Sequence, residues 1–191
     1  MASKQFFQFK ITLSDIAPSV WRGVEVQSDA SLYHLAAVII GAMGWHGGHL
    51  HQFRMGKEYY GLPHKDDSSK VLDERKVTIG DIVDKKGIKK FIFEYDFGDG
   101  WEHAVQFEKV VEPQKGVKYP RCTDGARNCP PEDCGGPPGY EDFLLAIGDP
   151  MHPEHEDMRQ WIGCDFDPEA FDLEDVSDLA EIVEDLEEQW K

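Results

Sequence analysis

The feature that most constrains the fold is an alternation of apolar and polar residues on both sides of the turn Gly98-Asp99-Gly100. Before the turn, the aromatic positions are Phe91, Phe93, Tyr95 and Phe97, and after it the same period continues at Trp101, His103, Val105 and Phe107. A period of two is typical of a strand with one face toward a core, and Asp-Gly is a preferred hairpin turn. The pattern predicts a β-hairpin at the centre of a sheet.

The N-terminal part predicts two further strands and a helix. Residues 7–13 and 21–27 alternate between apolar and polar side chains, so they predict an antiparallel pair joined by a turn around Pro18. A helix follows, with Ser28 or Asp29 as its expected N-cap. Its apolar face is formed by Leu32, Leu35, Ala36, Ile39, Ile40 and Met43.

The remaining chain divides into three kinds of segment. Residues 50–60 predict two strands with a turn at Gly56, residues 64–70 an exposed loop, and Thr78 the cap of a short helix ending near Lys86. Residues 113–139 contain six prolines and three cysteines without periodicity, so we expect an irregular loop. Helices are predicted at 140–147, 153–162 and 173–190, which makes residues 140–191 mostly helical.

Strands come first in this order and most helices come last, which is typical of an α+β fold. The chain has 191 residues, of which 40% are hydrophobic, and this is enough for a packed core. We therefore expect a single domain over residues 1–191, with helices packed on one side of a largely antiparallel sheet.

The charge balance limits the partners that the chain can have. Asp and Glu number 37 against 20 Lys and Arg, so the formal net charge is −17 and we expect a negative potential over most of the surface. Direct nucleic-acid binding usually depends on basic residues that release counterions, so we do not expect it here. A basic protein partner fits better. The apolar run at residues 35–43 is too short to cross a membrane, and no secretory pattern begins the chain, so we expect a cytoplasmic protein.

Four segments resemble a known family. They are Ile16–Arg22, His49–Phe53, Tyr95–His103, and Cys129–Asp133 leading to Gly135–Tyr140. These segments are similar to the plasmid pRiA4b open-reading-frame-three-like proteins, a family with an archaeal structural-genomics representative, and the resemblance covers nearly the whole chain. It implies an α+β fold, and it implies no particular activity, cofactor or catalytic set.

The loop at 113–139 is a candidate metal site. Cys122, Cys129 and Cys134 lie within thirteen residues, and thiolates are natural ligands for a zinc ion that would fasten such a loop. The spacing lacks a C-x2-C pair, so a fourth ligand would have to come from His103, His152, His155 or Cys164. The alternatives are reduced, partly buried cysteines and a Cys122–Cys129 disulfide.

Two histidines and the hairpin turn are further candidates. His49 and His51 stand two apart on an expected strand, so both rings would project from one face as a metal pair requires, although solvated polar residues are the alternative. The candidate functional surface around the turn consists of Asp96, Asp99, Trp101, Glu102 and His103. A carboxylate beside an imidazole can perform acid–base catalysis, and the alternative is an ordinary structural hairpin.

Three functional hypotheses follow. The leading one is a non-enzymatic, acidic interaction or accessory module of a plasmid- or mobile-element-associated family. The second is a metal-dependent hydrolase that uses the His49/His51 or the Asp99/His103 region. The third is a structural domain in which zinc serves folding alone.

Overall fold

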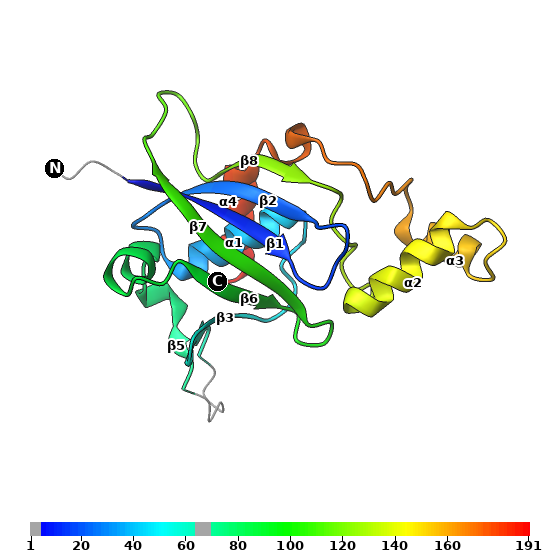
Figure 1. Cartoon of the computed structure of the whole chain (residues 1–191), viewed down its shortest axis with the longest axis horizontal. Coiled ribbons are helices and arrows are strands. Elements are labelled where there is room, and N and C mark those ends of the chain that lie inside the picture. Colours follow the sequence, from blue (N-terminus) through cyan, green and yellow to red (C-terminus); the bar gives the residue numbers. More distant parts are fainter. Residues whose placement is uncertain (1–4, 64–69) are drawn as a thin grey trace.

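The computed structural model of the protein describes residues 5–63 and 70–191. The exposed loop expected over residues 64–70 lies outside the described residues except for its last position. The architecture is a single open sheet with helices, which confirms the α+β fold (Figure 1).

Eight strands form the sheet in the order β5-β4-β3-β6-β7-β1-β2-β8. Their bounds are β1 Phe6–Leu13, β2 Trp21–Gln27, β3 His51–Met55, β4 Glu58–Gly61, β5 Leu72–Asp73, β6 Lys90–Tyr95, β7 Trp101–Val111 and β8 Arg121–Ala126. Neighbouring strands run antiparallel except β4 and β5. The hairpin β6–β7 occupies the middle of this order, which confirms the prediction from the alternation of residues 89–107.

Two helices cover one face of the sheet (Figure 1). They are α1 (Leu32–Met43) and α4 (Leu179–Gln189). The helices touch at Gly41, where an added Cβ would lie 3.0 Å from Ile182 Cγ2, so a larger side chain there would force them apart. The N-cap of α1 is Ser31, whose Oγ accepts from His34 N at 3.1 Å, and not Ser28 or Asp29. Residues 28–30 instead form the turn that leaves β2.

Helices α2 (Gly136–Gly148) and α3 (His155–Ile162) pack on each other and project from the end of the sheet (Figure 1). We call this pair the arm. Its own small core is built on Phe143, which packs edge-on against Trp161 and Phe166. The expectation of helices on one side of the sheet therefore holds for α1 and α4, whereas the arm extends beyond it.

Three segments differ from the sequence-based expectation. Residues 113–139 contain β8, which pairs with β2, and the first turn of α2. Residues 173–190 hold a 3-10 turn (Leu173–Val176) and then α4 instead of one helix. The short helix after Thr78 is present as one turn of π-helix (Asp81–Lys85), which we call the π-turn. The 3-10 turn Glu74–Lys76 precedes it. In the described part of the chain, every helix is too short or too polar to span a membrane.

Candidate functional site

Three side chains from distant parts of the chain meet beyond the end of β6. His49 precedes β3, Asp96 follows β6, and Asp133 precedes α2. His49 Nε2 lies 3.0 Å from Asp133 Oδ1, and His49 Nδ1 lies 3.5 Å from Asp96 Oδ2. One imidazole is therefore placed between two carboxylates, and all three groups reach solvent.

The two aspartates hold unusual backbone conformations. Asp96 has φ 54° and Asp133 has φ 61°, in the left-handed region that residues other than glycine seldom occupy. Asp96 Oδ1 accepts from Gly98 N at 3.0 Å and closes the turn between β6 and β7, which leaves Oδ2 directed at His49. The turn thus holds Asp96 Oδ1 in a hydrogen bond and leaves Asp96 Oδ2 facing His49.

A set of hydrogen bonds fastens residues 130–136 beside the β6–β7 turn. Glu132 accepts from the Tyr95 hydroxyl and from His46 N, the latter at 2.8 Å. Trp45 Nε1 donates to Pro130 O at 2.8 Å, and Gly135 N donates to Asp99 Oδ2 at 3.0 Å. Burial, together with the hydrogen bond to Glu132, raises the pKa of Tyr95, so this residue is a neutral donor at pH 7. The position of Asp133 follows from these contacts.

Gly136 shows how closely this segment approaches the turn. It has φ 71°, and a Cβ at this position would lie 2.2 Å from Asp99 O, which is closer than any real contact. Glycine is therefore required at position 136 for the segment to lie against the hairpin.

The group formed by His49, Asp96 and Asp133 has the composition of a metal site. One ligand atom from each residue lies within 4.8 Å of the other two, and no other set of three His, Cys, Asp or Glu residues in 5–63 and 70–191 is grouped in this way. Imidazole and carboxylate together suit Zn²⁺ or Mn²⁺. The Asp133 side chain is 68% exposed and that of His49 is 33% exposed, so water could complete the coordination of an ion.

The residues expected to form one surface around the hairpin turn are divided among different environments. Trp101 and His103 face the core and are 1% and 0% exposed. Glu102 lies on the opposite face of the sheet and pairs with Arg54 at 2.5 Å. Burial lowers the pKa of His103 to about 4, so this imidazole is neutral and inaccessible at pH 7. Asp96 is the member of the set that meets another candidate residue, His49.

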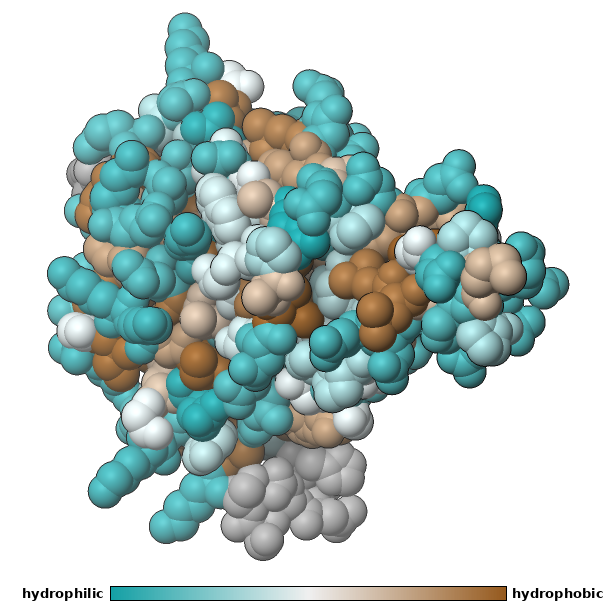
Figure 2. Space-filling view, turned by 45° about the vertical axis from the view of Figure 1, so that its right-hand side comes forward, coloured by the Kyte–Doolittle hydropathy of each residue, from teal (hydrophilic) through white to brown (hydrophobic). Residues whose placement is uncertain are grey.

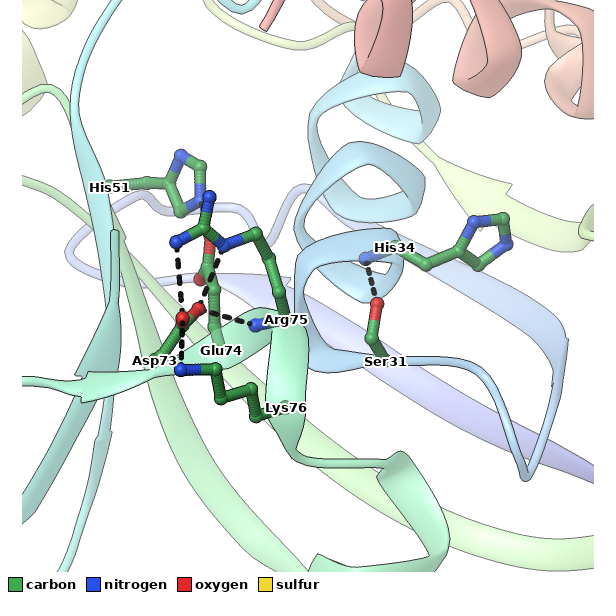
Figure 3. A network of polar contacts seen from close by, with 7 residues as sticks. All are labelled: Ser31, His34, His51, Asp73, Glu74, Arg75 and Lys76. Atoms are coloured by element: carbon green, nitrogen blue, oxygen red, sulfur yellow. Dashed lines mark hydrogen bonds and ion pairs between the residues drawn. The ribbon is translucent and has the colours of Figure 1, made fainter. Parts of the chain in front are cut away.

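His49 and His51 do not form a pair. His49 lies outside the strand, whereas His51 begins β3 and is buried. His51 Nε2 lies 2.9 Å from Glu74 Oε1, and the Trp190 ring covers the histidine with centroids 5.1 Å apart. Figure 3 shows His51 beside Glu74, which begins the 3-10 turn after β5, while Asp73 is the last residue of β5 and caps this turn. The two imidazoles thus belong to separate environments.

All four cysteines are free thiols. Cys129 Sγ accepts from Arg22 Nη2 at 3.1 Å and lies 3.2 Å from Met43 Sδ, inside the core. Burial raises the pKa of Cys129 to about 11 and that of Cys134 to about 12, and it also raises the pKa of Cys122. These groups therefore hold their protons at pH 7, and no three of the thiols form a metal-sized group with one another among the described residues.

Sequence reasoning did not find Asp133. It lies in the Pro/Gly/Cys-rich segment, whose cysteines are the candidate ligands that the sequence indicates. A local signal exists, because Asp133 is followed by Cys134, Gly135 and Gly136, and such a run indicates a sharp turn. That signal gives no information about the distant His49.

Comparisons with known proteins agree over most of the chain. An uncharacterized protein of Sinorhizobium fredii, y4hQ, is 38% identical over 184 residues, which are 96% of this chain and 93% of the relative. The crystal structure of a protein of unknown function from Methanosarcina mazei, MM3350, matches with a TM-score of 0.84 and 34% identity, over 92% of this chain and 99% of that one. The family model described as plasmid pRiA4b ORF-3-like protein matches residues 5–175, and the chain therefore belongs to this family.

Proposed function

We propose that the protein is a divalent-cation-dependent interaction module whose ion is held by His49, Asp96 and Asp133. The observation that carries this proposal is the placement of one imidazole and two carboxylates, from three separate segments, within 4.8 Å of one another. An ion at this point would join the loop before β3, the β6–β7 turn and the segment that leads to the arm. It would therefore fix the acidic arm relative to the sheet and offer open coordination positions to a partner.

The ligand chemistry narrows the choice of ion. Histidine nitrogen with two carboxylate oxygens suits zinc or manganese better than magnesium, which prefers an all-oxygen shell. The same geometry also suits a protonated imidazole that donates to both carboxylates without an ion. The two arrangements differ in one measurable property, which is affinity for a metal.

Isothermal titration of the full chain with ZnCl₂ and with MnCl₂ tests the proposal. We expect one equivalent to bind the wild type, and we expect His49→Ala and Asp133→Asn to weaken binding at least about tenfold, since each removes one of three ligands. The matched control is His46→Ala, because His46 is exposed and close in sequence but its ring is not part of the group. Unchanged affinity in His49→Ala, or no binding by the wild type, would refute the site.

A metal-dependent hydrolase is the second candidate. The exposure of Asp133 and His49 supports it, because a catalytic ion must keep a position open for water. The metal-loaded protein should be tested on nitrophenyl esters and phosphates. Turnover that disappears in His49→Ala and persists in His46→Ala would promote the enzyme over the interaction module.

Zinc held by Cys122, Cys129 and Cys134 remains a separate proposal. The same titration on Cys129→Ser tests it, since loss of zinc in this variant together with retention in His49→Ala would move the ion to the cysteines. We also propose the cytoplasm as the location of the protein, and the four free cysteines support this because they suit a reducing compartment.

A further inference from the structure

The acidic residues are concentrated in one part of the chain. Residues 132–190 contain 20 of the 37 acidic residues but a single basic one, Arg159, whereas residues 1–131 contain 17 acidic and 18 basic residues. The excess of negative charge therefore lies in the C-terminal part of the chain, whereas the charges of residues 1–131 nearly balance. The arm lies within this acidic part.

A groove of 340 Å³ opens between the two helices of the arm. It is lined by Asp133, Cys134, Gly139, Asp142, Phe143, Glu154, Met158 and Trp161. Figure 2 shows the arm as the projection on the right, where apolar surface lies directly beside hydrophilic surface. Three of the lining residues are carboxylates and three are large and apolar, so the groove has both an acidic and a hydrophobic character.

Two of the three carboxylates of the groove have no cationic partner among the described residues. Asp142 and Glu154 form no ion pair with any described residue, and Asp133 has the partly exposed His49 as its partner. The one basic residue of this part of the chain, Arg159, pairs with Asp165 at 3.2 Å and lines a different pocket. Asp142 and Glu154 are therefore available to a cation from outside.

The apolar walls suit the stem of a long cationic side chain. Trp161 is 47% exposed and is held edge-on against Phe143, with ring centroids 5.7 Å apart. Met158 lies in the same groove. Lysine and arginine pack their methylene stems on such surfaces, and their charged ends gain from an aromatic face in addition to carboxylates.

We propose that this groove binds an arginine or lysine side chain of a basic peptide segment in a partner protein. A purely apolar ligand would cover Asp142 and Glu154 without giving them a partner, which is unfavourable. A basic side chain satisfies both the carboxylates and the aromatic wall. Asp133 lines the groove and also belongs to the group of His49, Asp96 and Asp133, so the proposal is tested on Asp142 and Glu154, which are outside that group.

Fluorescence anisotropy with a labelled peptide of alternating arginine and glycine tests the inference. The full chain is titrated at physiological ionic strength, where the screening length is about 8 Å, with EDTA present to remove metal. The groove variant is Asp142→Asn/Glu154→Gln. The matched control is Glu184→Gln/Asp185→Asn, which changes the net charge equally at exposed positions on α4. A peptide with citrulline in place of arginine keeps the shape without the charge.

We expect the groove variant to weaken binding about tenfold and the α4 control by no more than about twofold, with little binding of the citrulline peptide. Trp161→Phe should weaken binding less than Trp161→Ala, and thermal melts of both variants establish that the arm is folded. Equal loss in the groove variant and the α4 control would overturn the proposal, since it would indicate diffuse attraction to an acidic protein. Equal binding of the citrulline peptide, or no saturable binding of the arginine peptide, would overturn it as well.

Discussion

His49 Nε2 lies 3.0 Å from Asp133 Oδ1, and this contact joins the loop before β3 to the segment that leads into α2. Neither residue is placed by its own secondary structure. His49 lies between α1 and β3, and Asp133 is held by the hydrogen bonds of its neighbours. The site therefore depends on how residues 130–136 attach to the sheet, which gives the first prediction.

Glu132 should control metal affinity without being a ligand. Its carboxylate accepts from Tyr95 and from His46 N, and so it sets the position of the adjacent Asp133. We expect Glu132→Ala to lower zinc affinity about tenfold, as loss of an outer hydrogen-bond partner commonly does. Glu132→Gln should recover part of this loss because its amide oxygen still accepts one of the two bonds. Titration with ZnCl₂ measures both, with the exposed Glu141→Ala as control, and wild-type affinity in Glu132→Ala would contradict the positioning role.

His103 should make stability fall as the solution becomes acidic. Its pKa is about 4 in the folded protein, because burial disfavours the charged ring, and about 6.5 when unfolded. Between pH 6.5 and 4 the unfolded state binds more protons, so the free energy of unfolding decreases as pH falls through this window. Across the whole window, His103 should lower the free energy of unfolding by about 3 kcal/mol.

Urea unfolding at pH 7.5 and pH 4.5 measures this contribution as a difference between proteins. The loss of stability between these two values should be smaller in His103→Leu than in the wild type. His46→Leu, at an exposed position, should behave like the wild type. The same pH dependence in all three proteins would show that His103 titrates normally in the fold.

Asp81 should stabilise the π-turn through its charged form. Its carboxylate accepts from Thr78 N at 3.0 Å and from Thr78 Oγ1 at 2.8 Å, while Asp81 N donates to Thr78 Oγ1 at 3.1 Å. A hydrogen bond from Lys85, together with those from Thr78, lowers the pKa of Asp81 from 3.8 to about 2. The charged Asp81 carboxylate therefore stabilises the folded protein fully above pH 3.8, and this stabilisation is lost as pH falls through about 2.

We expect Asp81→Asn to lower the free energy of unfolding at pH 7 by about 1 kcal/mol, the usual value of a cap, since the group is partly exposed. This difference from the wild type should shrink between pH 4 and pH 2. Chemical denaturation between pH 4 and pH 2 measures this difference in the free energy of unfolding. Asp84→Asn, at an exposed position, is the control variant. A difference that stays constant with pH would mean that the charge of Asp81 is not involved.

The central hairpin could be predicted from sequence because alternation is a local property of a strand. The same alternation places Trp101 and His103 on one face with Phe91 and Phe93, so it predicts their burial, and the expectation that they belong to a functional surface is wrong. Thr78 as a cap was equally local. By contrast, β8 has one buried apolar side chain, Cys122, and forms a strand through its pairing with β2.

The candidate site could be predicted only in part. The sequence indicates His49 and Asp96 as candidate residues, but it predicts His51, Asp99 and His103 as their partners. The actual partner, Asp133, is brought in by the attachment of residues 130–136, in which Glu132 bonds to Tyr95 and Gly136 fits against Asp99. Such contacts join segments that are distant in sequence, and neither periodicity nor spacing contains this information.

The cysteines give a final prediction, because reactivity depends on exposure and on the thiolate form. Cys164 is exposed, whereas Cys122 and Cys129 are buried and their pKa values are raised. Ellman's reagent at pH 8 should therefore modify one thiol rapidly in the folded protein, and this phase should vanish in Cys164→Ser. Cys134 is partly buried with a pKa raised to about 12, so it should react slowly, and all four thiols should react in urea.

Rapid reaction of Cys129 would contradict its place in the core. A second rapid thiol that appears only after a chelator is added would instead support zinc held by the cysteines, because removal of the ion would release a thiolate.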